Sequence, residues 1–447
     1  MIDTLNELVE KVVAQAAPGE EVEAVAVHSA DTEVRVYEGE IEQFSAAESQ
    51  GVGVRVIVDH RQGFAYSGTL DPEAVAEALA EARDNARFGS PDEHLGLAEP
   101  DGVEAVELDV YRPSLADVAT DDKIALAIEL ERATRAADGR ISGIETAEYA
   151  DSIVASAVAT SSGLRNSSQE TGCYLTSYAM ATEGDDTQTG FGFSIGRDFT
   201  ELDGAKAASD AAMRATRLLG AVKPATERLT VVLDPFVTAQ FLAILASSFS
   251  GEAVLKGYSL FGERQGETVA APTITLVDDP TLPEAFSATS TDGEGLATRR
   301  NVLIHAGVVE GFVHNTYTGK RTGTASTGSA IRGYSSTPGV GCMAVSLDPG
   351  TRSQEELIAD IDHGVLIQGV SGLHSGVNPV SGDFSTGADG LMIRNGAVAE
   401  PVREFTIAST LQKMLTDVIE IGGDVEHLPM SATGLSLVIG EVTVSGS

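Results

Sequence analysis

The eight histidines are the first candidates for chemistry. Two histidines one turn apart on a helix, with Glu directly after the first, would hold a catalytic zinc ion. None of the eight is followed by Glu, and no two lie within five residues of each other. A zinc site assembled from histidines that are distant in the sequence stays open as an alternative. Its candidate ligands are His305, His314, His363 and His374.

A second pattern, at residues 192–196, matches the Gly-x-Ser-x-Gly elbow of serine hydrolases, with Ser194 as the nucleophile. That elbow needs a strand, a sharp turn and a helix directly behind the serine. Phe191, Phe193 and Ile195 instead alternate as in a strand, which places Ser194 on its polar face. The sequence therefore disfavours a serine hydrolase and leaves Ser194 as a minor alternative.

Two glycine pairs are weak candidates for nucleotide binding. Gly51 and Gly53 lie inside an expected strand and lack the third glycine of a dinucleotide-binding loop. Gly319 precedes Lys320, but the upstream glycine of a phosphate-binding P-loop is missing. Neither pattern supports a nucleotide site.

The stretch at residues 318–341 is rich in Gly, Ser and Thr and concentrates positive charge in an acidic chain. It contains Lys320, Arg321 and Arg332. Cationic groups on a glycine-rich loop can approach a peptide backbone or a carboxylate. These three residues are therefore candidate peptide-binding residues, and an ordinary surface loop is the alternative.

The charge of the chain argues against polyanionic partners. The formal net charge is −38, and no basic stripe offsets it, so nucleic acid and anionic membranes would be repelled. Cys173 and Cys342 form neither a disulfide framework nor a CxxC metal motif, which suits a reducing compartment. The first residues lack the pattern of a signal peptide, and the apolar run at 236–249 is too short to span a bilayer. We expect a cytoplasmic protein without a membrane segment.

The elements that position these residues predict an α+β fold of three domains: an N-terminal domain at 1–95, a central domain at 96–222 and a β-rich C-terminal domain with a few helices at 223–447. In the first domain, Asp71 and Pro72 begin a helix that runs to residue 87. The N-terminal helix ends near Pro18. The strands expected in this domain lie at 23–28, 33–38, 41–47, 51–59 and 63–67.

The central domain repeats this order of elements, which suggests a related second layer. After a surface linker at 89–119, a helix at 121–138 with Thr120 as its cap precedes the strands, and an alanine-rich helix at 203–219 follows them. The expected strands lie at 143–149, 153–160, 171–182 and 189–196.

The C-terminal domain begins with a buried strand that leads into an apolar helix, which we call the focal helix. It starts at Pro235 and ends in a Gly/Ser-rich turn before Phe261. A hairpin at 301–315 and the loop at 318–341 follow. Further elements are expected as a strand at 343–347, a helix at 353–361, strands near 364–370, 382–387, 390–394 and 397–400, a helix at 407–420 and a final strand at 435–444.

Together these stretches resemble the TldD/TldE (PmbA) family, formerly described as gyrase modulators. The resemblance covers nearly the whole chain in the expected order. The stretches that carry it are residues 51–68, the helix from 71 to 87, the focal helix with GEAVLKGYSLF (251–261), residues 292–323, GADGLMIRNGAVAEPV (387–402) and the helix at 407–420.

The resemblance implies a heteromeric cytoplasmic metallopeptidase whose catalytic subunit, TldD, carries an HExxxH motif on the focal helix and a further cysteine ligand near its C-terminus. An ungapped alignment places the three motif positions at Leu242, Ala243 and Ser247. Residues 236–250 contain no His, Glu, Asp or Cys, and no cysteine follows Cys342. Aliphatic and hydroxyl side chains do not replace imidazole as zinc ligands.

The leading hypothesis is therefore a TldE/PmbA-like subunit that has no catalytic residues and binds no metal itself. The resemblance implies that zinc resides in a TldD-like partner and that the pair encloses small unstructured peptides, including peptide-antibiotic precursors and antitoxins. A homodimer is the alternative assembly for the isolated chain. Two other functions stay open: a self-sufficient hydrolase that uses distant histidines or Ser194, and a module that acts through protein association alone.

Overall fold

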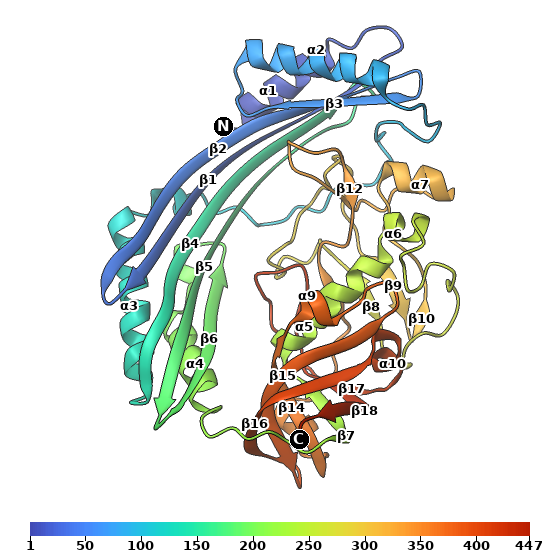
Figure 1. The fold of residues 1–447 in the computed structure, drawn as a ribbon. Helices are drawn as coiled ribbons and strands as arrows, with labels where there is room; N and C mark the ends of the chain where they lie inside the picture. Colours follow the sequence, from blue (N-terminus) through green and yellow to red (C-terminus); the bar gives the residue numbers. More distant parts are fainter.

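The computed structural model describes all 447 residues, and the predicted α+β class is confirmed. The first half of the chain builds one antiparallel sheet in the order β3-β2-β1-β4-β5-β6, which arches over the C-terminal domain (Figure 1). Its strands are β1 (Glu21–Tyr37), β2 (Glu40–Val58), β3 (Arg61–Ser67), β4 (Ile141–Thr160), β5 (Arg165–Glu183) and β6 (Asp186–Gly196).

These strands correct two expectations. The short strands expected in the first domain merge into the long β1 and β2, and those at 143–149 and 153–160 merge into β4. The central unit also forms no second layer, because β1 pairs with β4 from Glu23 to Val36 and both units share one sheet.

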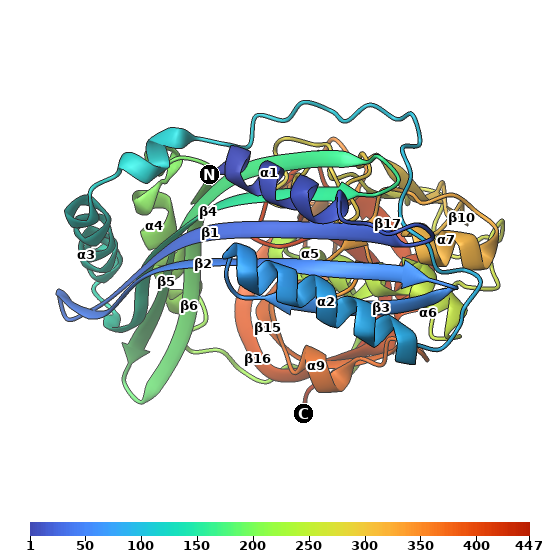
Figure 2. The same ribbon diagram turned by 90° about the horizontal axis from the view of Figure 1, so that it is seen from above.

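All four N-terminal helices cover one face of this sheet. Alternate residues of β1 point to opposite faces, so Val22, Ala24 and Ala26 pack beneath the first two helices, while Val34 and Val36 pack beneath the other two. The helices are α1 (Ile2–Val13), α2 (Pro72–Phe88), α3 (Thr120–Ala137) and α4 (Gly204–Thr216), and Figure 2 shows α1 and α2 lying across the strands. The residues between these positions on β1 face the C-terminal domain.

Of the two helix caps expected in the first half of the chain, one is confirmed and one is wrong. Asp71 accepts hydrogen bonds from the backbone N–H groups of Glu73 and Ala74, as expected for the cap of α2. Thr120 is instead the first residue of α3, and Ala119 occupies the cap position without a side-chain bond. Pro113–Asp117 forms a short 3-10 helix within the expected linker, and Phe199–Glu201 forms another before α4.

The C-terminal domain is centred on a sheet in the order β16-β15-β14-β7-β18-β17, and an added pairing of β16 with β18 closes five of these strands into a barrel. The strands are β7 (Glu227–Leu233), β14 (His363–Ser371), β15 (Asp383–Arg394), β16 (Ala397–Thr410), β17 (Val418–Ile421) and β18 (Leu437–Ser445). A smaller sheet contains β8 (Leu276–Asp278), β9 (Asn301–His305), β10 (Val308–Val309) and β13 (Val345–Leu347), and β11 (Ala330–Ile331) pairs with β12 (Gly339–Val340).

The focal helix is α5 (Pro235–Ala246). Asp234 caps it by accepting a 3.1 Å hydrogen bond from the N–H of Phe236, and Pro235 fills the first turn, where an N–H has no helical partner. Its apolar side chains enter the largest core of the molecule. The other helical segments of this domain are Ser247–Phe249, α6 (Gly251–Leu255), α7 (Thr316–Thr322), α8 (Gln354–Ile358), α9 (Leu373–Gly376) and α10 (Leu411–Thr416).

Two segments of this domain differ from expectation. The loop expected from residue 318 begins inside α7, whose cap Asn315 accepts from the N–H of Thr318 at 2.8 Å. The helix expected at 407–420 is confined to α10, because residues 407–410 complete β16 and Val418 begins β17. No helix of the molecule combines the length and the apolar character needed to cross a membrane.

Candidate functional site

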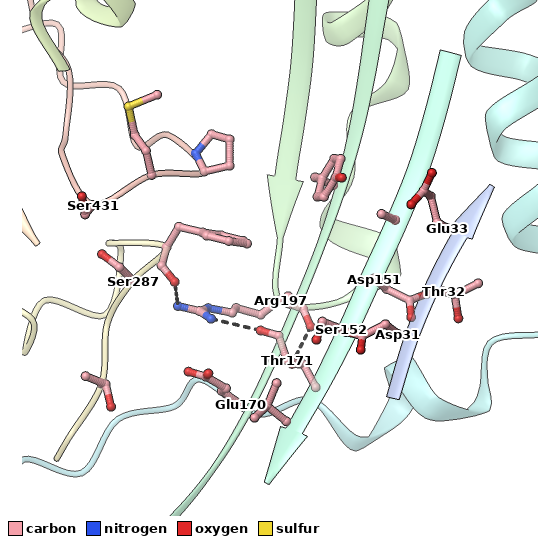
Figure 3. A pocket seen from close by; sticks show the side chains of 18 of the residues that line it. Asp31, Thr32, Glu33, Asp151, Ser152, Glu170, Thr171, Arg197, Ser287 and Ser431 are labelled. Carbon is pink, nitrogen blue, oxygen red and sulfur yellow. Dashed lines mark hydrogen bonds between the residues drawn. The ribbon is translucent and has the colours of Figure 1, made fainter. Parts of the chain in front are cut away.

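The largest cavity, of about 850 Å³, lies between the sheet and the C-terminal domain. Its sheet wall consists of residues on the face opposite the helices, including Glu33 on β1, Ser152 on β4 and Glu170 on β5 (Figure 3). Its other wall comes from the C-terminal domain and includes Ser287 and Ser431. Residues from near both ends of the chain thus face one space.

Arg197 fixes the position of the two walls relative to each other. Its guanidinium donates to the carbonyl oxygen of Thr171 on β5 at 3.0 Å, and to those of Ala285 at 3.1 Å and Phe286 at 2.6 Å (Figure 3). The same group stacks on the Phe286 ring at 5.3 Å. Burial lowers the pKa of Arg197, but an arginine stays charged at neutral pH. Its donors are thus committed to the backbone and have little capacity for a ligand.

The remaining charges of this cavity are carboxylates. Asp151 is neutralised by Lys123 of α3, whose Nζ lies 2.5 Å from its oxygen. Asp31 and Glu33 remain on the sheet wall, and Glu33 has only a 3.6 Å contact with the half-exposed Arg35. Glu170 has no ion-pair partner within 4 Å, and burial raises its pKa. The cavity therefore favours cationic or amine-bearing ligands over anionic ones.

A second hollow, of about 410 Å³, opens on the focal helix and is joined to the first through Ser431, which lines both. Ala243 and Ser247 line it, whereas Leu242 is fully buried in the core. These are the positions expected for the zinc-binding motif of the catalytic relatives. A methyl, a hydroxyl and a buried isobutyl group offer no imidazole, thiolate or carboxylate, so the residues present do not fit a zinc ion.

Cys342 also lines this second hollow, but its chemistry does not supply the missing ligand. Its Sγ lies 3.7 Å from the carbonyl oxygen of Ala246, and burial holds the pKa of the thiol well above its ordinary value. The protonated thiol is a poor ligand and a poor nucleophile.

A third hollow, of about 330 Å³, continues from the second because Glu252, Lys256 and Val340 line both. Arg321 of α7 lines it and is exposed, with a 3.0 Å hydrogen bond to the Tyr317 hydroxyl and Asp92 at 3.9 Å. We call the three connected hollows the groove. Lys320 is exposed on the same helix and points toward Gly96 rather than into the groove.

Arg332 occupies a different environment from the exposed loop that the sequence suggested. Its side chain is 1% exposed and forms an ion pair with Glu23 of β1. Glu23 also receives two hydrogen bonds from Arg55 of β2, at 3.1 and 2.7 Å, and Arg55 lies 3.7 Å from Glu294. We call Glu23, Arg55, Glu294 and Arg332 the interface cluster. It joins the sheet to the C-terminal domain, so in this conformation Arg332 has no exposed surface for a peptide.

The alternative catalytic residues are not brought together. No group of three or more His, Cys, Asp or Glu side chains is arranged to hold a metal ion. His305 ends β9, His314 is buried beside Thr318, His374 belongs to α9, and His363 contacts Glu227 at 3.1 Å. The four candidate ligands therefore form no shared site.

The hydroxyl of Ser194 forms a hydrogen bond with the backbone and is not placed for nucleophilic catalysis. Ser194 lies inside β6, as the alternation of its neighbours predicts, without the strand-to-helix elbow of a hydrolase. Its Oγ accepts a 2.8 Å hydrogen bond from the N–H of Asp203, next to the start of α4. This contact assigns the hydroxyl a structural role.

Sequence reasoning missed the residues of the largest cavity, notably Glu170 and Arg197. The signal available in the sequence was the two-residue alternation of a strand. Along β5 the buried residues are Thr171, Cys173 and Leu175. Glu170, Gly172 and Tyr174 lie between them and so share the face opposite the helices. What covers that face depends on contacts with residues more than a hundred positions later, which no local pattern encodes.

Comparisons with known proteins agree with this architecture. Three family models match in order: PmbA/TldA metallopeptidase domain 1 at residues 22–86, the central domain at 113–219 and the C-terminal domain at 226–446. The chain is 27% identical to the metalloprotease PmbA of Escherichia coli O157:H7, over 91% of this chain and 88% of that protein. It is 28% identical to a metalloprotease of Methanothermobacter thermautotrophicus, over 89% and 86% of the two chains.

A solved structure extends the match to the whole fold. The crystal structure of TldE from Thermococcus kodakarensis superposes with a TM-score of 0.90 and 27% identity, covering 99% of each chain. The resemblance inferred from the sequence motifs is therefore confirmed. The chain belongs to the PmbA/TldD metallopeptidase family.

Proposed function

We propose that this chain is the non-catalytic, TldE/PmbA-like subunit of a two-component zinc peptidase in the cytoplasm. In this proposal a TldD-like partner carries the zinc ion and the catalytic residues. The present chain completes the compartment in which small unstructured peptides are held. It binds no cofactor itself and interacts with neither nucleic acid nor membrane.

One observation carries the proposal. The focal helix presents Ala243 and Ser247 to the second hollow and buries Leu242, so the helix keeps its position and lacks every zinc-ligating side chain. A relative that hydrolysed peptides through its own zinc would need imidazole or carboxylate groups at this surface. The scaffold without the ligands favours an enclosing subunit.

The groove supports the peptide part of the proposal. It extends from the sheet, past the focal helix, to Arg321 on α7. A peptide that lies along it would contact both the walls of the largest cavity and the exposed end of α7. Carboxylates at one end and Arg321 at the other suit the amino and carboxyl termini of a short peptide. Arg321 is thus the sequence candidate that we retain as a peptide contact, Lys320 is an exposed neighbour, and Arg332 acts through the interface cluster.

Metal content of the isolated chain tests the non-catalytic assignment. The chain purified without a metal-affinity tag should contain almost no zinc by elemental analysis and should not cleave unstructured peptides. Stoichiometric zinc that a chelator removes together with peptidase activity would overturn the proposal and return attention to the scattered histidines.

Reconstitution with a TldD-like catalytic chain tests the subunit role. Mixing should produce a complex that cleaves peptides faster than the catalytic chain alone, and a catalytic chain with its HExxxH glutamate replaced by Gln should assemble without cleaving. If that inactive complex still performed the biological function, the chain would act through protein association alone.

A further inference from the structure

A separate cavity of about 450 Å³ lies between the central domain and the C-terminal barrel, and shares no lining residue with the groove. One wall comes from β6 and α4, and the other from β14, β15 and β16. In Figure 1 the ribbons of β14, β15 and β16 lie next to one another. Three arginines line it: Arg214, Arg217 and Arg403. Such a concentration of cations is unusual in a chain with a net charge of −38.

Arg217 is the central feature of this cavity because its guanidinium makes no direct contact with a carboxylate, and Asp234 and Asp389 act on it only at longer range. Its guanidinium takes part in no hydrogen bond and no ion pair, and its Nε is buried. Burial lowers the pKa of Arg217 to about 10, so the side chain remains charged at neutral pH. An unpaired buried charge is strongly unfavourable unless a counter-charge reaches it.

Arg214 lies on the same wall and is only partly satisfied. It stacks on the Phe191 ring at 4.4 Å and lies 3.9 Å from Asp234, yet its Nε and Nη1 are buried without a hydrogen-bond acceptor. Two guanidiniums of residues that line the cavity therefore keep N–H donors without an acceptor. This is the donor arrangement that binds a carboxylate through paired hydrogen bonds.

An unpaired carboxylate lines the same cavity. Asp389 of β15 accepts no hydrogen bond and lies in no ion pair within 4 Å, although Arg217 belongs to the same lining. Gly369 leaves room for it, because a Cβ there would lie 2.4 Å from the Asp389 Oδ2. The cavity thus offers an anion and cations that attract each other across it without forming a direct ion pair.

The backbone around Asp389 departs from regular pairing on both sides. The β14–β15 register shifts between Ile367 and Gly369, which leaves Gln368 outside the ladder. The β15–β16 register shifts between Ala388 and Gly390, opposite Arg403 and Glu404, and Glu404 has a positive φ of 57°. Bulges and strained residues of this kind redirect side chains and are common beside binding sites.

Gln368 gives an independent indication of a ligand. Its side chain lines the cavity, is 6% exposed, and its Oε1 is buried without a hydrogen-bond donor. Buried amide oxygens are almost always paired, and an unpaired one needs an explanation. A ligand that carries an N–H donor would supply that partner.

We propose that this cavity binds a small zwitterion, namely a free amino acid or a very short peptide. Its carboxylate pairs with Arg217 and Arg214, and its ammonium pairs with Asp389 and donates to Gln368. Apolar side chains in the lining, such as Leu218 and Phe405, accommodate its side chain. Because Arg217 belongs to the central domain and Asp389 to the barrel, the ligand holds the two domains together.

A simple phosphate fits this lining less well. Asp389 would repel a second negative charge, and the buried Gln368 oxygen cannot donate to a phosphate oxygen. A zwitterion satisfies the unpaired groups of both signs at once. The site stands apart from the groove, so it does not depend on the proposed peptidase role.

Binding is tested on the full chain by thermal unfolding in the presence of each of the common L-amino acids, followed by calorimetric titration of the strongest. At least one should raise the melting temperature, while its amide, which lacks the carboxylate, and its N-acetyl form, which lacks the ammonium, should bind about ten- to hundredfold more weakly. Stabilisation by none of the amino acids, equal binding of the amide, or stabilisation by inorganic phosphate alone would overturn the proposal.

Variants separate a binding role from a structural one. Arg217→Gln and Asp389→Asn should each weaken binding about tenfold or more, whereas the exposed Arg228→Gln on β7 should bind normally. Without ligand, Arg217→Gln should unfold at the same or a higher temperature than the parent, because it removes an unpaired buried charge. A lower melting temperature together with unchanged ligand affinity would show that Arg217 is structural and refute the assignment.

Discussion

Removal of Glu23 is the sharpest test of how the sheet is joined to the C-terminal domain. In Glu23→Gln, Arg55 loses a bidentate partner at 2.7 and 3.1 Å, and Arg332 loses its only carboxylate. Arg55 would then keep only its 3.7 Å contact with Glu294, and Arg332 would have no carboxylate partner. Since all four side chains are nearly inaccessible to solvent, we expect a loss of about 3–5 kcal/mol in the free energy of unfolding.

The dependence on pH follows from the ionisation of Glu23. Burial opposes ionisation, but Arg55 and Arg332 outweigh it and hold the pKa of Glu23 below its ordinary value. A carboxyl group with a lowered folded-state pKa stabilises the fold above the unfolded-state pKa and loses this contribution as the pH falls through the folded-state value. The parent should therefore lose this part of its stability below about pH 4.3, and Glu23→Gln should lack that component.

Urea unfolding followed by circular dichroism gives the free energy, and hydrogen exchange locates the change. Glu129→Gln is the matched control, because Glu129 pairs with Arg132 at 2.6 Å but both side chains are more than half exposed. Its cost should stay below about 1 kcal/mol. A cost for Glu23→Gln no larger than that of this control, or hydrogen exchange that does not rise in β1, β2 and residues 292–332, would contradict a stabilising role for the interface cluster.

Three further predictions concern single side chains. Ser194→Ala should lower the free energy of unfolding by about 1–3 kcal/mol, through the unpaired N–H of Asp203, and leave peptide cleavage by the reconstituted complex unchanged; lost cleavage would revive the serine mechanism. Arg321→Ala should raise the KM of that complex for peptides without lowering the melting temperature, whereas Arg332→Ala should lower the melting temperature. Unchanged kinetics for Arg321→Ala would show that Arg321 does not contact the peptide. Cys342 should react with iodoacetamide more slowly than a free thiol at pH 8, as followed by mass spectrometry, and rapid alkylation would contradict its buried, protonated state.

The elements with one clear apolar face were predictable from the sequence. Helices α1, α2 and α4, strand β3 and the hairpin of β9 and β10 form where the periodicity and caps predict them, although α1 ends at Val13, before the end expected near Pro18. A strand was expected at 41–47, but its continuity with the strand expected at 51–59 was not predictable, because residues 40–49 are exposed on both faces and show no alternation of burial. Pairing with β1 alone defines that segment as a strand.

The prediction of a helix at 407–420 was wrong for a different reason. Ile407, Leu411, Met414, Leu415 and Val418 follow helical spacing and are all buried, yet they come from the end of β16, from α10 and from the start of β17. Burial in one core can thus imitate helical periodicity across three elements. The candidate site shows the same limit, since the charge of Arg332 was visible in the sequence but its partner on β1, more than 300 residues earlier, was not.

The focal helix explains why this chain can retain the family scaffold without the chemistry of a zinc site. Zinc ligands must point into an accessible space, but Leu242 packs fully buried in the largest core, next to the strands that form the barrel. A histidine there would carry a polar ring into an apolar environment without a hydrogen-bond partner, which is destabilising. The aliphatic side chain instead contributes apolar burial at a position where the ungapped alignment with the zinc-binding motif expects a ligand. At this position of the focal helix the side chain therefore serves the packing of the core and offers nothing to a metal ion.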